Sequence, residues 1–176
     1  KMMHVNVYSR SARVRLMLNG KTIAEKTPDS LLTAKFDLPY APGELKAVAV
    51  ENGKETASIT LVTTGTAKKL RLITDGSTIK ASRNDLSYII LEVTDENGNT
   101  VPDADIPIQF TVTGNGELAG IGNSNPQDMA SFKQPECKTF RGKCLVVLRP
   151  KGLPGEIILE AKATGLSNTK IIIHAK

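Results

Sequence analysis

Apolar and polar residues alternate along most of the chain, and this period of two constrains the fold more than any other feature. In "RVRLMLNGKTIAEK", Val14, Leu16 and Leu18 share one side of an extended segment, and an Asn-Gly pair follows. Successive side chains of a strand point to opposite faces, and Asn-Gly favours the positive φ angles of a two-residue hairpin turn. The stretch therefore predicts a β-hairpin over residues 13–26.

The same pattern fills the first sixty or so residues, and a second Asn-Gly pair stands at 52–53. No window of eleven or more residues places apolar groups at the spacing of an amphipathic helix. Many short strands joined by tight turns are typical of a small antiparallel sandwich. We expect strands at residues 3–8, 13–19, 21–26, 31–38, 44–51 and 54–62.

The small polar stretch "TTGTAKKL" at 63–70 has the composition of a linker, and the alternation restarts after it. Ile89, Leu91 and Val93 line one face of a later strand, and several similar segments follow, ending with an apolar strand at 171–173. The chain is therefore expected to be all-β, with two β-sandwiches in tandem. We place the first at residues 1–64 and the second at residues 65–176, with a long loop at 120–141.

Charge does not point to a nucleic-acid or membrane partner. The chain has 23 basic and 18 acidic residues, a net charge of +5, without a run of five or more like charges. A nucleic-acid arm would concentrate its positive charge, and a membrane-spanning helix would need about 20 consecutive apolar residues. The first residues, "KMMHVNVYSR", are already strand-like. We therefore expect a fragment of a longer protein, with no nucleic-acid and no membrane contact.

Residues that carry metal or acid–base chemistry are scarce. The two histidines, His4 and His174, stand at opposite ends, and no Cys-x-x-Cys pair occurs. The stretch "DENGNTVPDAD" at 95–105 offers oxygens to calcium, but it lacks the later Glu of an EF-hand loop, and an Asn-Gly turn explains the same residues. No carboxylate pair is singled out as an acid–base couple. We expect no metal, no cofactor and no catalytic residue in this chain.

Residues 120–144, "GIGNSNPQDMASFKQPECKTFRGKC", interrupt the regular strands. A long loop inside a compact domain is usually either functional or disordered, and its glycines and asparagines suggest ordered turns. Three interpretations remain open: a self-packed surface loop, a loop that docks on a neighbouring domain, or a ligand site. For a ligand site, Asn123 and Asn125 are the candidate binding residues. Aromatic residues make up only 4% of the chain and Trp is absent, which disfavours a flat sugar-binding platform.

Both cysteines of the chain bracket "KTFRGK". If a hairpin turns at Phe140-Arg141, Cys137 and Cys144 would face each other across the strands at a distance that permits a disulfide. Alternatively, Cys144 alternates with apolar neighbours and is an ordinary buried thiol. A disulfide would fit a periplasmic or secreted location, which is the location we expect.

Longer motifs add a resemblance to a known family. The stretches "VYS" at 7–9, "VRLMLNG" at 14–20, "PYAPGELKA" at 39–47 and "TG" at 64–65 resemble the immunoglobulin-like domain that follows the catalytic barrel in family-2 glycoside hydrolases of the β-galactosidase type. The stretches "LSYIILEVTDENGNTVPDAD", "GNGELAGIGNSNP" and "FRGKCLVVLRP" resemble the next domain of these enzymes. That domain is itself similar to immunoglobulin-like modules of bacterial adhesins.

The resemblance implies two tandem immunoglobulin-like β-sandwiches at the C-terminal end of a retaining exo-glycosidase that acts on β-galactosides or related sugars. The family's two catalytic glutamates lie on an (α/β)₈ barrel, which nothing in this chain resembles, so no catalytic residue carries over. The implied role is non-catalytic: support of the barrel in the same polypeptide, or contact with another subunit. The alternatives are a carbohydrate-binding module and a tandem adhesin or cell-surface module.

Overall fold

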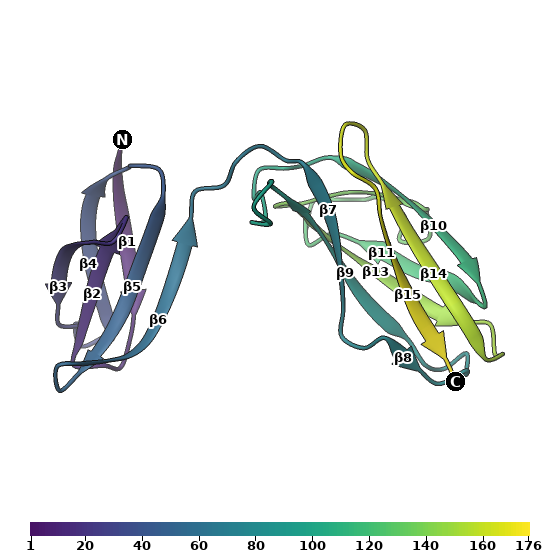
Figure 1. The fold of residues 1–176 in the computed structure, drawn as a ribbon, viewed down its shortest axis with the longest axis horizontal. Coiled ribbons are helices and arrows are strands. Elements are labelled where there is room, and N and C mark those ends of the chain that lie inside the picture. Colours follow the sequence, from purple (N-terminus) through teal and green to yellow (C-terminus); the bar gives the residue numbers. More distant parts are fainter. The chain divides into compact units, whose positions relative to one another are not determined.

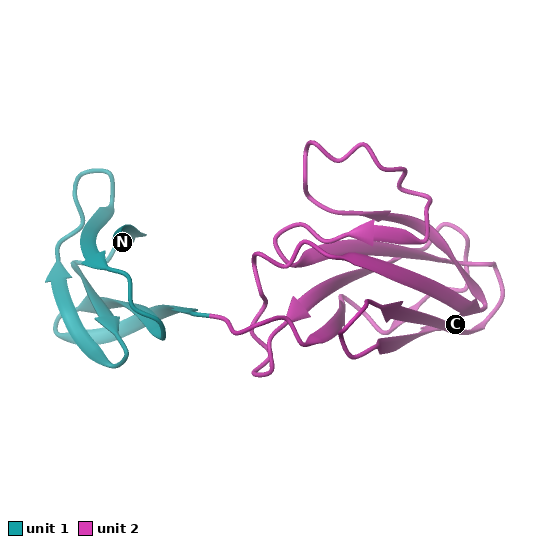
Figure 2. Ribbon diagram, turned by 90° about the horizontal axis from the view of Figure 1, so that it is seen from above, with its two compact units in different colours: residues 1–63 teal, residues 64–176 magenta.

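A computed structural model describes all 176 residues, and every regular element in it is a β-strand (Figure 1). The strands form two compact units, Lys1–Thr63 and Thr64–Lys176 (Figure 2). The expected all-β class, with two sandwiches in tandem, is confirmed. The structure contains no helix that could span a membrane.

Unit 1 (Lys1–Thr63) contains six strands in two sheets. One sheet has four strands in the order β3-β2-β5-β6, and the other pairs β1 with β4. Side chains from both sheets, with Phe36 only 2% exposed, form a small core between them. The strands are β1 (Met2–Tyr8), β2 (Arg13–Leu18), β3 (Lys21–Lys26), β4 (Thr33–Pro39), β5 (Glu44–Glu51) and β6 (Lys54–Val62).

The two Asn-Gly pairs form the predicted hairpin turns. Asn19 and Gly20 have φ angles of 49° and 77°, and Asn52 and Gly53 have the same values. Positive φ at both central residues defines a type I′ turn, whose twist matches that of the flanking strands. The turns join β2 to β3 and β5 to β6, which pair antiparallel.

Unit 2 (Thr64–Lys176) is a sandwich of a four-stranded and a five-stranded sheet. Their orders are β11-β13-β9-β7 and β12-β10-β14-β15-β8. The apolar core between them is large, because inward side chains of all the long strands contribute to it. The strands are β7 (Lys69–Thr74), β8 (Thr78–Ile79), β9 (Ser87–Thr94), β10 (Pro107–Gly114), β11 (Gly116–Gly122), β12 (Glu136–Lys138), β13 (Lys143–Pro150), β14 (Gly155–Lys162) and β15 (Thr169–Ala175).

The hairpin expected at Phe140-Arg141 turns one residue later. Arg141 and Gly142 have φ angles of 52° and 73°, and Phe140 bridges to Lys143. The residues before and after this turn enter different sheets, since β12 pairs with β10 and β13 pairs with β9 and β11. The turn therefore crosses from one layer of the sandwich to the other.

Candidate functional site

The long loop of unit 2 is an ordered connection between β11 and β12. The last residues of the loop join the sandwich through backbone hydrogen bonds: the Ile121 N–H donates to the Phe132 carbonyl at 2.7 Å, and the Phe110 N–H donates to the Pro135 carbonyl at 2.8 Å. The phenyl ring of Phe132 lies over Gly122, where a Cβ atom would come within 3.3 Å of it. The loop is thus fixed against the edge of the four-stranded sheet.

The candidate residues Asn123 and Asn125 lie at the start of this loop and hold its shape. The Asn123 amide donates to Asp128 Oδ2 and to the Lys138 carbonyl, both at 2.7 Å, and its Oδ1 accepts the Asn125 N–H at 3.0 Å. Asn125 Oδ1 accepts the Gln127 N–H at 3.0 Å. These bonds occupy the amide nitrogen and oxygen of Asn123 and the oxygen of Asn125, so the pair has a structural role, and its binding role stays a prediction.

A polar cavity of about 430 Å³ lies beneath the loop. Its wall includes Asn123, Asn125, Phe132, Glu136 and Lys138. Asp128, one of three acidic residues in the wall, accepts N–H groups from Ala130 and Asn123, and these bonds lower the pKa of its carboxyl group. The cavity has the size of a small-molecule site, but its polar groups bond mainly to the loop itself.

Cys137 on β12 and Cys144 on β13 meet inside the sandwich, from opposite sheets. Both thiols are free and buried. A hydrogen bond from the Cys144 thiol lowers the pKa of Cys137, and the same bond together with burial raises the pKa of Cys144. The two cysteines are therefore close together, as predicted. They do not face each other across one hairpin, because β12 and β13 belong to different sheets. The disulfide itself stays a prediction.

The outer face of the four-stranded sheet carries an apolar surface that sequence reasoning did not single out. Strand register aligns Ile73, Ile90 and Leu145 in one row across β7, β9 and β13, and Tyr88 beside Val147 in the next. Ile90 is 43% exposed and Leu145 is 39% exposed. We call these five residues, with Phe132 of the loop, the apolar face.

The apolar face is hollowed on the side of the loop. Gly120 and Gly122 on β11 stand opposite Val147 and Leu145 and present no side chain there. Phe132 rises beyond them, so that a groove of about 550 Å³ forms with Ile90, Leu145 and Val147 in its wall. The loop thus serves as one wall of an apolar groove.

Paired charges border the apolar face on one side. Arg71, Glu92 and Lys143 stand in one row of the sheet, where Glu92 accepts Arg71 Nε at 3.1 Å and Lys143 Nζ at 2.7 Å. Burial raises the pKa of Glu92, but the two cations outweigh burial and hold the pKa below its usual value.

On the opposite border, Arg83 pairs with Glu117 at 3.0 Å, and Arg149 stands opposite Glu117 on β13. The Arg149 Nε atom is buried without a hydrogen-bond partner. Together the two borders hold four cations and two anions, so the rim of the apolar face has a net positive charge.

The stretch considered for calcium is organised around Asp95 instead. Its two oxygens accept the N–H groups of Gly65, Asn97 and Asn99, at 2.9 to 3.0 Å. The bond from Gly65, followed by those from Asn99 and Asn97, lowers the pKa of this buried carboxyl. Asp95 therefore fixes the turn after β9 to the start of unit 2.

The family follows from comparison with known proteins. Residues 70–172 match the family described as Glycoside hydrolase family 2 C-terminal domain 5. Residues 1–57 match a family described as Domain of unknown function (DUF4982). Because the first match spans more than half of the chain, the chain belongs to glycoside hydrolase family 2, as part of its C-terminal region. The resemblance seen in the sequence is confirmed.

Two curated relatives are named as β-galactosidases. The chain is 40% identical over 171 residues to Beta-galactosidase BoGH2A of Bacteroides ovatus. This match covers 96% of this chain and 20% of the relative. It is 30% identical over 176 residues to a Beta-galactosidase of Thermoanaerobacter pseudethanolicus. This match covers 89% of this chain and 22% of the relative. The chain spans about a fifth of the length of these relatives.

Solved structures support the same family assignment. A glycosyl hydrolase family 2 member from Bacteroides cellulosilyticus has a TM-score of 0.96 and 38% identity, and the match covers 100% of this chain and 23% of that one. A beta-glycosidase from Bacteroides vulgatus has a TM-score of 0.95 and 30% identity over 99% of this chain and 23% of that one. The strands of this chain are thus found in larger family-2 proteins.

Proposed function

We propose that residues 1–176 are a non-catalytic accessory region of a longer β-galactosidase-like enzyme, and that the apolar face of unit 2 packs on the catalytic part of the same polypeptide. The apolar face carries this proposal. Its centre is apolar and its borders are charged, which is the pattern of a protein interface with a dry core and a polar rim. Outer faces of sandwich strands that remain in water are mostly polar.

The length of the relatives also supports the proposal of an accessory region. About four-fifths of their length lies outside the matched region, and both are named as β-galactosidases. All the regular structure in this chain is β-strand. We therefore propose that the barrel of strands and helices with paired glutamates, which the resemblance implies, lies elsewhere in the polypeptide. The proposed substrates of the whole enzyme are therefore β-galactosides, hydrolysed outside residues 1–176.

The partner that covers the apolar face is proposed to be the catalytic part, since both belong to one chain. A second subunit is the alternative partner. The net positive rim fits a partner surface with acidic residues at its border.

Activity measurements test whether hydrolysis takes place outside residues 1–176. The full-length polypeptide is expected to hydrolyse a chromogenic β-galactoside, while residues 1–176 alone show no turnover above buffer. The same assay with the full-length polypeptide cut off before Lys1 shows what the accessory region adds. Turnover by residues 1–176 alone would contradict the proposal.

A carbohydrate-binding module is the second candidate, because a polar cavity of about 430 Å³ lies beside Asn123 and Asn125. Calorimetric titration with galactose and lactose, with NMR shifts at the two asparagines, tests it. Saturable binding that Asn125→Ala weakens would make the cavity a sugar site. Absence of binding at millimolar sugar would leave the loop with a structural role. Membership in family 2 favours both readings over an adhesin.

A further inference from the structure

The two layers of unit 1 differ in width. The four-stranded sheet β3-β2-β5-β6 faces a sheet made of β1 and β4 alone. The β4 strand lies near β3, because Lys26 Nζ on β3 donates to the Lys35 carbonyl at 2.6 Å and lies over the Phe36 ring. The β1 strand follows on the side of β5 and β6, and its second edge has no partner within residues 1–176. No strand therefore stands opposite β6.

The inner face of the four-stranded sheet stays apolar where the opposite layer is missing. Register places Leu16, Ala47 and Ile59 in one row across β2, β5 and β6. Leu16 is buried, whereas Ile59 at the end of the row is 66% exposed, and Leu61 on the same face of β6 is 64% exposed. The apolar rows thus run past the edge of the two-stranded layer.

The β1 strand shows the same incomplete cover. Its inward side chains Val5 and Val7 are only half-buried, although Phe36 and Ala34, which pair with them on β4, are fully buried. A shallow hollow of about 200 Å³ lies between the end of β1 and the edge at β6 and has Val7 and Ile59 in its wall. Both layers therefore leave apolar groups in water along the same open side.

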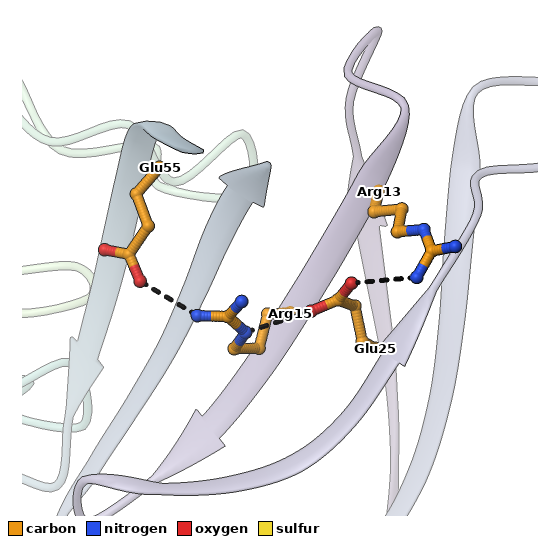
Figure 3. Close-up of polar contacts among 4 residues, drawn as sticks. All are labelled: Arg13, Arg15, Glu25 and Glu55. Atoms are coloured by element: carbon orange, nitrogen blue, oxygen red, sulfur yellow. Dashed lines mark hydrogen bonds and ion pairs between the residues drawn. The ribbon is translucent and has the colours of Figure 1, made fainter. Parts of the chain in front are cut away.

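The outer face of the same sheet carries a network of charged side chains. Arg15 bonds to Glu25 and to Glu55, each at 3.0 Å, and Arg13 reaches Glu25 at 3.3 Å (Figure 3). Ile59 and Leu61, the most exposed large apolar side chains of β6, both lie on its inner face, where a complete sandwich would bury them.

We propose that a further β-strand from the same polypeptide, outside residues 1–176, completes this sandwich. Its backbone pairs with the free edge of β1, and alternate apolar side chains pack on Ala57, Ile59 and Leu61. The occupant is a strand because a free edge offers unpaired N–H and C=O groups and the apolar row repeats every second residue.

The source is the same polypeptide because the relatives extend far beyond the matched region, and a tethered strand acts at a high effective concentration. An open apolar edge would otherwise invite edge-to-edge aggregation. The inference concerns unit 1 and does not depend on the apolar face of unit 2.

Thiol labelling of the full-length polypeptide tests the inference. Ile59→Cys and Thr60→Cys place single thiols on opposite faces of β6, and peptide mass spectrometry reads maleimide uptake at each position. Both side chains are exposed within residues 1–176. If a strand covers the inner face, Ile59→Cys should react at least about tenfold more slowly than Thr60→Cys, since reaction then requires local opening.

Ala57→Cys provides a second inner-face thiol with almost no change in volume, in case the substitution of Ile59 disturbs folding. It too should react at least about tenfold more slowly than Thr60→Cys. Equal rates for Ala57→Cys and Thr60→Cys in the native enzyme would overturn the inference. Protection that disappears on dilution would also overturn it, because the occupant would then be a second copy rather than the same chain.

Discussion

Glu92 stands on the outer face of β9, yet only 6% of it is exposed, because Arg71 and Lys143 lie on either side of it. The two cations hold its pKa below the usual value. A carboxyl group whose pKa is lower in the folded state adds stability above its unfolded pKa, and this stability is lost as the pH falls through the folded pKa.

We therefore expect Glu92→Gln to lower the free energy of unfolding by about 1 kcal/mol at pH 7, the upper end for ion pairs with half-exposed cations. The loss should be smaller at pH 3, because the native glutamate becomes protonated as the pH falls through its folded pKa. Urea unfolding at both pH values measures this. Glu96→Gln is the control and should change less, because the Glu96 side chain is itself exposed and pairs with Lys69 alone. An equal loss at pH 7 and pH 3 would contradict the role assigned to Glu92.

The cysteine pair gives a second prediction at this scale. Cys137 and Cys144 are buried side by side, and the Cys144 thiol has a raised pKa, so neither should react readily in the folded protein. For protein made in an oxidising compartment, we predict a disulfide. Alkylation after unfolding, with and without reductant, followed by intact mass, decides this. Two labelled thiols in the unreduced sample would refute the disulfide.

Turns decide how the strands of unit 2 change layers. Gly142 has a φ of 73°, and a Cβ atom there would lie 2.2 Å from the Val101 carbonyl oxygen. Gly165 has a φ of 77° and open space around it. Gly142→Ala is therefore expected to lower the free energy of unfolding by about 2–4 kcal/mol, since it adds a backbone clash to the strain.

Gly165→Ala is the matched control and should cost about 1 kcal/mol, the strain of a left-handed residue alone. Thermal or urea unfolding of unit 2 compares the two variants. Similar losses in the free energy of unfolding for both variants would mean that the contact with Val101 relaxes and does not contribute to the loss.

The strands of unit 1 were predictable because their signals are local. Alternation assigns one face to the core, and the Asn-Gly pairs at 19–20 and 52–53 fix the hairpins by backbone geometry alone. The short strands β8 and β12 were not predicted, because two or three residues carry no periodicity. The turn at Arg141-Gly142 was placed one residue early, since its strands pair with different neighbours rather than with each other.

The apolar face had a signal in the sequence that alternation alone hides. Tyr88 and Ile90 stand between the core residues of β9, so this strand is apolar on both sides, as in strands covered on both faces. The groove could not be predicted, because it depends on where the loop carries Phe132. The same holds for Asn123 and Asn125, whose internal hydrogen bonds follow from the path of the loop.

At the scale of the whole molecule, each unit has a complete side and an apolar side that residues 1–176 do not cover. In unit 2 the uncovered side is the apolar face, and in unit 1 it is the inner face of β6. The chain also spans only about a fifth of its β-galactosidase relatives. Both observations agree with a region that works as part of a larger enzyme.

The central claim is that the apolar face packs on the catalytic part, and Leu145→Lys tests it most directly. Hydrogen exchange of peptides from β13 measures the opening free energy of unit 2, in residues 1–176 alone and in the full-length enzyme. In the isolated region Leu145 is part-exposed, and the loss should stay below about 1 kcal/mol. In the full-length enzyme a buried unpaired ammonium should cost about 3 kcal/mol or more.

Leu153→Lys is the control, because Leu153 is exposed in the turn between β13 and β14 and is not one of the residues of the apolar face. It should change the opening free energy little in either context. A large loss for Leu145→Lys in the full-length enzyme only is the predicted result. A small loss in both contexts would show that this surface stays in water, and would contradict the account.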